Sequence, residues 1–237
     1  MRRAAAFAAA LLAAAPAAAE PYAAVYDLYL GGFRAAEIAL TVRAEGAAYE
    51  ADATLTARGI LGAFLSAQAT AAAAGRVESD GAAPERFDAD ARFGADRYRI
   101  AMRWAVNPGL TVEADPPLRK RPYDAPPDAL KGALDPLSAA AIALPPRPAA
   151  EACGRTIPVF DTRRRFDVTL DEGRVEGDRL VCDGHYVRVA GYKTITPENE
   201  AHPFTVWWRL QDGEAHFERL QTPTRFGYAA AVRRAAP

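Results

Sequence analysis

The sequence is poor in the residue types that carry most enzyme chemistry. Its 237 residues include two cysteines and three histidines, and its serines are Ser66, Ser79 and Ser138. None of these serines lies in a Gly-x-Ser-x-Gly turn. Phosphate-binding glycine loops, His-Glu-x-x-His and Cys-x-x-Cys motifs are absent as well. The sequence therefore predicts a protein without catalytic residues, metal ligands or a cofactor.

A strong net charge and long internal apolar runs are also lacking. The formal net charge is −1, whereas a nucleic-acid partner requires a basic stripe or patch. Beyond residue 19, no apolar run approaches the roughly 20 residues that cross a bilayer as a helix. We expect no nucleic-acid partner, and no transmembrane span once the N-terminal segment has been removed.

The first nineteen residues have the pattern of a cleavable export signal. A basic start precedes an apolar run over residues 4–15, and the small residues Ala17 and Ala19 stand just before Glu20. A short membrane anchor is the alternative. It is disfavoured because the run is short and almost entirely alanine. We therefore expect cleavage before Glu20 and a soluble exported protein.

Cys153 and Cys182 are the only cysteines in the chain. Two cysteines in an exported protein favour a disulfide, and closing a loop of this length stabilises a fold by about 3–4 kcal/mol. A metal site using Cys182 and the nearby His185 is one alternative, and a reactive thiol is the other. The disulfide is the favoured interpretation.

Apolar and polar residues alternate with a period of two along most of the chain. Ala36, Ile38, Leu40 and Val42 share one face of a strand, and the same pattern recurs over residues 49–58 and 97–104. Glycine-containing turns separate these segments. Asp27, on the opposite face from Tyr26, is expected to be solvated. The pattern predicts a meander of short antiparallel strands.

Two segments interrupt the alternation. Residues 59–65, GILGAFL, fit a short helix or a strand crossing. Residues 135–144, DPLSAAAIAL, predict a helix that Asp135 caps and that Pro145 ends. Proline-rich stretches flank this helix. They divide the chain into an N-terminal sheet over about 20–115, a linker with the helix over about 116–150, and a C-terminal sheet over about 151–237.

About ten strands with one apolar face must curl or pack in two layers to bury that face. A membrane barrel also alternates, but its apolar face meets lipid and carries aromatic girdles. Here the apolar face is rich in alanine, which suits close packing inside a protein. We therefore expect an all-β fold with one or two short helices. The strands should form a curled antiparallel meander, spiral or open and barrel-like, in a single soluble domain over residues 20–237.

Several segments resemble an exported bacterial family catalogued as domain of unknown function 3108. They are YDLYLGGFRAAEIAL, LDPLSA, IPVFDTRRRFDVTL, RVAGY and the Cys153–Cys182 pair, in the order of that family. The family commonly has glycine where this chain has Thr162, which puts a turn with positive φ in doubt there. The resemblance implies a periplasmic location in Gram-negative bacteria and no established activity. The architecture is similar to that of periplasmic, disulfide-bonded β-spiral proteins of envelope integrity.

The segment FDTRRRFD, residues 160–167, carries the densest charge. Alternation places Arg164 on the apolar face with Phe166 and Val168, where a charge needs a structural partner or an anionic ligand. Asp161, Arg163, Arg165 and Asp167 would then lie on the solvated face.

Four further residues are candidate contacts for a ligand or partner. Tyr186 and Arg188 alternate together, so an Arg–Tyr cluster would form with Arg164 if their strands are neighbours. Trp207 and Trp208 point to opposite faces of one strand. We expect one indole in the core and the other exposed as a contact surface.

These features favour a non-catalytic periplasmic envelope protein. It would act as a scaffold or cradle for an envelope protein partner or for an apolar ligand, either a lipid or a peptide. One alternative is an envelope enzyme that acts on glycan or lipid through carboxylates such as Asp161 and Asp167. Another is a purely structural envelope module. A filled interior would favour the scaffold, and an arginine-lined pocket would favour ligand binding.

Overall fold

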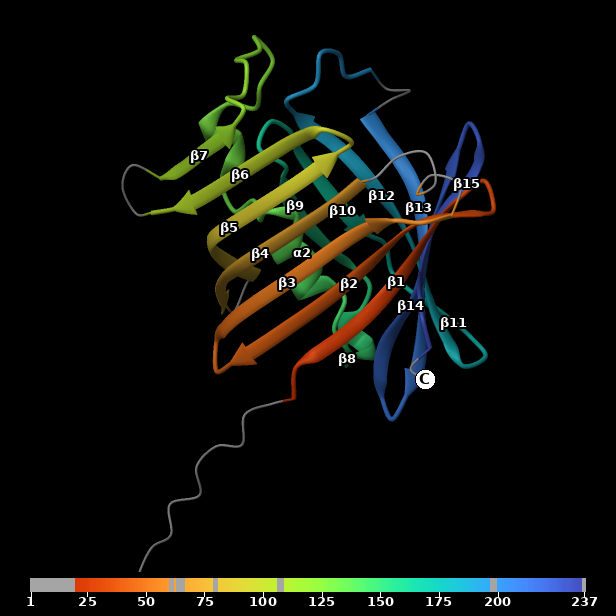
Figure 1. The fold of residues 1–237 in the computed structure, drawn as a ribbon. Coiled ribbons are helices and arrows are strands. Elements are labelled where there is room, and N and C mark those ends of the chain that lie inside the picture. Colours follow the sequence, from red (N-terminus) through yellow and green to blue (C-terminus); the bar gives the residue numbers. More distant parts are fainter. Residues whose placement is uncertain are drawn as a thin grey trace, which may run out of the picture.

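The computed structural model describes residues 20–59, 62, 67–78, 81–105, 109–196 and 200–235. Its strands form one sheet that curls around a short helix, as the alternation predicted (Figure 1). The N-terminal half contains β1 (Tyr22–Leu30), β2 (Phe33–Glu45), β3 (Ala48–Ala57), β4 (Ala67–Glu78), β5 (Gly81–Phe93), β6 (Asp96–Trp104) and β7 (Leu110–Asp115). The C-terminal half contains β9 (Arg155–Phe160), β10 (Arg165–Leu170), β11 (Arg174–Glu176), β12 (Arg179–Ala190), β13 (Ala201–Gln211), β14 (Glu214–Thr224) and β15 (Gly227–Arg233).

The connecting segment between the halves lies where the proline-rich linker was expected. It contains η1 (Pro127–Leu130), α2 (Pro136–Ala143), β8 (Arg147–Pro148) and η2 (Ala149–Glu151). Of the expected helix or crossing over 59–65, the structure describes Gly59 and Gly62, both helical. The rest of that segment and the expected export signal lie outside the described residues.

Most strands pair with their neighbours in sequence, as in a meander. The order is β7-β6-β5-β4-β3-β2-β1-β15-β14-β13-β12-β10-β9, while β8 pairs with β14 and β11 with β12. One long-range pairing joins the two halves, because β1 runs antiparallel to β15 with Asp27 opposite Val232. The predicted curled antiparallel meander is thus confirmed, and both halves belong to one continuous sheet.

The two faces of the sheet follow the alternation closely. In the N-terminal half, Ala51, Ala73, Phe87 and Met102 lie opposite one another on consecutive strands and are all buried. Asp52, Ala72 and Asp88 form the adjacent row on the outer face. Because directly opposed residues share a face, the alanine-rich side is the inner side.

Helix α2 fills the space between the halves (Figure 1). The Asp135 side chain accepts hydrogen bonds from the backbone N–H groups of Leu137 and Ser138, as expected of an N-cap. Leu137 and Ala141 pack into the main core, whereas Ala139 packs on a second cluster with Ile157. The helix is therefore buried on more than one side, and the small alanines of the inner face let it approach the sheet.

Aromatic residues of both halves complete the core. The Tyr26 ring meets the Phe217 ring edge to face, with centroids 5.5 Å apart. Phe217 meets Trp208 in the same way at 5.6 Å. Tyr26, Phe217 and Trp208 are each less than 5% exposed. The interior of the curled sheet is consequently packed with side chains in this region.

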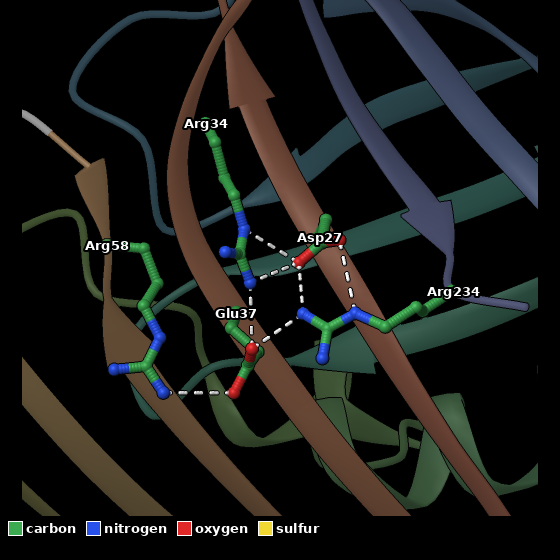
Figure 2. Close-up of polar contacts among 5 residues, drawn as sticks. All are labelled: Asp27, Arg34, Glu37, Arg58 and Arg234. Atoms are coloured by element: carbon green, nitrogen blue, oxygen red, sulfur yellow. Dashed lines mark hydrogen bonds and ion pairs between the residues drawn. The ribbon is translucent and has the colours of Figure 1, made fainter. Parts of the chain in front are cut away.

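An ion-pair network covers the outer face where β1 meets β2 and β15 (Figure 2). Arg234 donates to Asp27 and Glu37, with both N–O distances 2.7 Å. Arg34 binds the same two carboxylates at 2.6 and 2.8 Å, and Arg58 reaches Glu37 at 3.1 Å. The hydrogen bond from Arg234 is the main cause that lowers the pKa of both carboxyl groups. Asp27 lies on the outer face, as expected, but it is paired rather than freely solvated.

Candidate functional site

Cys153 and Cys182 lie at disulfide distance, with Cα atoms 5.8 Å apart. Cys182 is in β12 and fully buried, whereas Cys153 lies between η2 and β9. A Cβ atom added to Gly173 would lie 2.5 Å from the Cys153 sulfur, so a glycine is needed there. Within the described ranges, no cluster of three His, Cys, Asp or Glu side chains can hold a metal ion. The geometry is that of a disulfide rather than of a metal site.

Arg164 is not on the apolar face, and that expectation is wrong. Its side chain is 47% exposed and lies 3.9 Å from the Asp161 carboxylate. The cause is a turn in which Asp161 accepts from the backbone N–H groups of Arg163 and Arg164. Thr162 adopts φ of 87° there, so the turn has the positive φ that its threonine put in doubt. Strand β10 consequently begins at Arg165, after the turn.

Neighbouring charged residues that were expected on the solvated face are buried as a result. Arg165, expected to be solvated, is 9% exposed and forms an ion pair with Asp167. Arg163 is also largely buried, and its guanidinium lies 3.0 Å from Asp124 of the linker. Asp161 and Asp167 are thus occupied by a turn and by an ion pair.

The Arg–Tyr cluster does form, because β10 and β12 are neighbours. Phe166 lies opposite Arg188, and Val168 opposite Tyr186. The rings of Phe166 and Tyr186 are 4.5 Å apart. We call this group, together with Tyr192 and the exposed Arg164, the tyrosine–arginine cluster.

Tyr192, which the sequence did not single out, lies at the centre of the tyrosine–arginine cluster. Its hydroxyl is hydrogen-bonded to that of Tyr186. The guanidinium groups of Arg188 and Arg164 lie 5.1 and 5.6 Å from its ring. Burial raises the pKa of Tyr192, and the bond to Tyr186 adds to the effect. Gly191 makes this placement possible, since a Cβ there would lie 2.2 Å from the Arg163 carbonyl oxygen.

Two arginines that sequence reasoning missed approach the interior. Arg155 lies opposite Leu170, on the same face as Ile157 and Val159. The Nε and Nη2 atoms of Arg155 are buried without a hydrogen-bond partner among the described residues. Burial lowers the pKa of Arg155. Arg155 alternates with Ile157 and Val159, just as Arg164 was expected to alternate with Phe166 and Val168. The same pattern could therefore have identified Arg155.

Arg147 lies near Arg155 but has a structural role. It donates to the carbonyl oxygen of Ile142 at the end of α2, and more weakly to that of Pro145 at 3.4 Å. Its guanidinium lies 5.9 Å from the centre of the Trp208 ring. Burial, with a contribution from the charge of Arg155, lowers the pKa of Arg147 to about 10. This arginine therefore holds the helix end against the sheet.

A cavity of about 370 Å³ opens beside Arg155. It lies between the β4–β5 hairpin, β9 and the end of α2. Its wall consists of Glu78, Gly81, Ala82, Gly132, Leu134, Ile142, Arg155, Thr156, Ile157 and Pro158. Most of this wall is apolar, and Arg155 and Glu78 add one charged group of each sign.

The two tryptophans take opposite faces. Trp208 is 2% exposed and belongs to the core. Trp207 is half-buried on the outer face, where Arg219 lies 5.5 Å from its ring, so it is less exposed than expected. It lines a groove of about 260 Å³ that shares Gln221 and Tyr228 with a second groove of about 520 Å³. Trp207 is therefore part of a larger outer surface.

Exposed aromatic residues gather next to these grooves. The turns of the β1–β2 and β14–β15 hairpins lie side by side, since the Gly31 N–H donates to the Tyr228 carbonyl at 2.9 Å. Phe33, Phe226 and Tyr228 are 66%, 60% and 57% exposed. We call this surface the hairpin patch and define it by Tyr29, Trp207, Phe226 and Tyr228, which line the two grooves. Leu30 and Phe33 pair with each other on the opposite face.

A groove of about 680 Å³ crosses the outer face of β3 to β7. Small residues such as Ala72 and Ala101 form its floor, and carboxylates such as Asp88 and Asp90 line it. Arg103 pairs with Asp88 at 2.6 Å, and Arg97 and Arg99 pair with Asp90. These carboxylates are therefore satisfied within the sheet.

Comparison with known proteins gives a family and one solved structure. The model of the family described as "Protein of unknown function (DUF3108)" matches residues 25–232. No curated protein matches the sequence. A crystal structure of a beta-barrel-like protein of domain of unknown function DUF1849 from Brucella abortus is 11% identical, with a TM-score of 0.43. The likeness covers 90% of this chain and 95% of that chain. Among the described residues, no helix has the length and hydropathy needed to cross a membrane.

Proposed function

The chain belongs to the DUF3108 family of proteins of unknown function, and from that premise we propose that it is a non-catalytic periplasmic scaffold. In this role the curled sheet binds an envelope protein through the hairpin patch. The export signal expected in residues 1–19 supports a periplasmic location, as does a cysteine pair at disulfide distance, because such bonds persist outside the cytosol.

The packed interior is the observation that favours a scaffold over a cradle enclosing a large apolar ligand. Tyr26, Met102, Val206 and Trp208 belong to one continuous core that draws on both halves of the sheet. Helix α2 occupies the space that a ligand inside the sheet would need. Binding of a partner is therefore assigned to the outer surface.

The hairpin patch has the chemistry of a protein-binding surface. Large exposed apolar groups on adjacent turns are uncommon unless a partner covers them. Tyrosine, tryptophan and arginine dominate the binding energy of protein interfaces. Here Arg219 lies over Trp207, and Arg225 lies 4.6 Å from the Phe226 ring. Because these side chains come from both ends of the chain, the patch exists only in the closed sheet.

Site-specific photo-crosslinking in living cells tests the proposal. A benzophenone amino acid at Tyr228 is expected to give a discrete adduct with an envelope protein. The matched control is Tyr98, an exposed tyrosine on the remote β5–β6 hairpin. Phe226→Ser is expected to abolish the Tyr228 adduct, and Phe93→Ser is expected to preserve it. Equal adducts from Tyr228 and Tyr98, or none from either, would exclude the patch as the binding surface.

The enzyme alternative receives no support from the carboxylates on which it was based. Asp161 holds the turn before β10, and Asp167 pairs with Arg165. A glycosidase requires two carboxyl groups facing one substrate. We therefore retain the scaffold as the single proposed function.

A further inference from the structure

We propose that the loop over residues 118–121 docks the protein on the surface of an anionic phospholipid bilayer. This inference goes beyond the scaffold role, because the loop shares no residue with the hairpin patch. It rests on a run of exposed cations, on the contacts that hold the loop in place and on the apolar side chains that stand exposed beside the charges.

The loop carries three consecutive basic residues. Arg119, Lys120 and Arg121 are all exposed, and the segment between β7 and η1 that contains them projects beyond the end of the sheet (Figure 1). None of the three forms an ion pair with a described residue. Exposed arginines of the sheet such as Arg43 and Arg103, by contrast, pair with carboxylates. The charge of the loop is therefore available to an external anion.

Contacts within the protein hold the loop so that its basic side chains remain outside. The Arg163 guanidinium donates to the Arg119 carbonyl oxygen at 2.8 Å and lies 3.0 Å from the Asp124 carboxylate. Asp124 accepts from the Arg121 N–H at 2.9 Å, which closes the turn. Because the loop uses its backbone for these contacts, its cations are presented by a segment that is already ordered, which lowers the entropic cost of binding.

A second loop adds positive charge to the same surface. A Cβ atom at Gly191 would lie 2.2 Å from the Arg163 carbonyl oxygen, so the chain after Gly191 passes directly beside the anchor of the first loop. Lys193 in this second loop is exposed. The Arg164 guanidinium, also exposed, lies 5.6 Å from the centre of the Tyr192 ring. Cations from three segments of the chain thus gather at one end of the molecule.

Three carboxylates next to these loops are already engaged. Asp124 binds Arg163, and Asp161 accepts from backbone N–H groups of its own turn. Asp115, at the base of the first loop, lies 3.4 Å from Arg99. An excess of positive charge consequently remains. Each basic residue close to an anionic bilayer strengthens binding about fivefold, so a run of three suffices to select such a surface.

The exposed apolar side chains favour a bilayer over a soluble anion. Leu118 stands directly before the basic run and is 37% exposed, and Ile195 follows Lys193 and is 38% exposed. Cations with aliphatic groups beside them match the interface of a bilayer, where charged headgroups lie next to hydrocarbon. A free phosphate or a soluble polyanion would bind the cations and leave these apolar groups in water.

Vesicle flotation of the mature protein tests the assignment. The probes are vesicles of phosphatidylcholine alone and vesicles that also contain phosphatidylglycerol. We expect binding to the anionic vesicles at low ionic strength, at least about tenfold weaker binding to the neutral ones, and release in high salt. Equal binding to both kinds of vesicle, or no binding to the anionic vesicles, would overturn the proposal. So would release by inorganic phosphate beyond that by sodium chloride at equal ionic strength, since it would reveal a site for a soluble anion.

Substitutions then locate the surface. The triple variant Arg119→Gln, Lys120→Gln, Arg121→Gln is expected to weaken binding to anionic vesicles at least about tenfold. Its melting temperature should match that of the wild type, because the three side chains are exposed. Leu118→Ser is expected to weaken binding about threefold or more and to leave its salt dependence unchanged, since it removes an apolar contact and no charge.

The matched control is the triple variant Arg43→Gln, Arg76→Gln, Arg92→Gln. It removes the same amount of charge from exposed positions on the sheet, and we expect it to bind anionic vesicles nearly as tightly as the wild type. An equal loss of binding in the two triple variants would show that net charge, and not this loop, determines binding.

The scaffold and the membrane surface can fail separately. Vesicle binding is expected to persist in Phe226→Ser, and the Tyr228 crosslink is expected to persist in the triple variant of residues 119–121. Flotation of the purified wild-type protein decides the membrane proposal whether or not a protein partner exists.

Discussion

The two halves of the sheet differ in how many of their buried polar side-chain atoms lack a hydrogen-bond partner. Within the described ranges, eight buried side-chain nitrogen or oxygen atoms have no hydrogen-bond partner. Seven of them belong to residues between Arg147 and Trp208, and the remaining one is the Tyr49 hydroxyl. Native proteins leave few such groups, and each requires an explanation. The difference indicates that buried polar atoms are less completely hydrogen-bonded from the linker onward than in the N-terminal half.

The arginines show the same contrast. On the outer face of the N-terminal half, Arg43 pairs with Asp52, Arg86 with Glu50 and Arg103 with Asp88. The inner face there consists of apolar residues, many of them alanine, that pack in the core with α2. In the C-terminal half, Arg155 and Arg188 lie on the inner face with unpartnered Nε atoms.

Removing the disulfide is expected to have the largest effect and acts on the C-terminal half. Cys153→Ser with Cys182→Ser opens a loop with a sequence separation of 29. The free energy of unfolding should fall by about 3–4 kcal/mol, because the unfolded chain regains conformational entropy. Urea unfolding measures it, and wild-type protein under reducing conditions is the control. No loss of stability in either sample would show that the two sulfurs are not bonded in the native protein.

Overpacking the N-terminal half tests whether its inner face is tightly packed. Ala73→Leu adds bulk at a residue that is 1% exposed in the core beside α2. We expect a loss of about 1–3 kcal/mol, since a packed core cannot accept three more carbon atoms without strain. Ala72→Leu, the next residue on the outer face, is the matched control and should be near neutral. Similar losses in both variants would contradict the assignment of faces.

Removing the unpartnered charge of Arg155 should have the opposite sign. Arg155→Met keeps an apolar side chain about as long as the aliphatic part of arginine and removes the positive charge. We expect stability to rise by about 0.5–2 kcal/mol, the range typical of a single stabilising substitution. Arg163→Met, which breaks the ion pair with Asp124, should lower stability instead. A loss of stability in both variants would mean that Arg155 is structural and that the contrast between the halves is smaller than proposed.

The sequence predicted the architecture because strand patterning is local. Alternation with period two reports which face of a strand is buried, and the cap, the first-turn proline and the alanines of α2 lie within one segment. The pairing of β1 with β15 joins residues about 200 positions apart, so neither the network of Figure 2 nor the hairpin patch could be derived from a local pattern. The error at Arg164 has a physical cause of the same kind. Alternation was continued through a turn, and Arg155, which has the same pattern at the start of β9, was overlooked.

The turn at Thr162 can be stabilised by a substitution. Thr162 has φ of 87°, a conformation that costs a residue with a Cβ about 1–2 kcal/mol relative to glycine. Thr162→Gly is therefore expected to raise the melting temperature, with a gain of about 1 kcal/mol in the free energy of unfolding. Thr169→Gly in β10 should lower stability, because glycine weakens the interior of a strand. A loss of stability in Thr162→Gly would show that the threonine side chain has a role in the turn.

The smallest effect is expected from the ion-pair network, which joins the two halves on the solvent side. Arg234→Gln removes the group whose hydrogen bonds hold the pKa values of Asp27 and Glu37 below their usual range. Because these pKa values are lowered in the folded protein, the stabilisation is complete above the values of the unfolded chain. It is lost as the pH falls through the folded values. The difference in melting temperature between wild type and Arg234→Gln should therefore be small at pH 7, should vanish in acid and should shrink in high salt. Arg92→Gln is a control with no ion pair to lose among the described residues, and its difference should not change with pH. If Arg234→Gln were as destabilising as the loss of the disulfide, the closure of the sheet would depend on charge, and the packed core could not be what joins the halves.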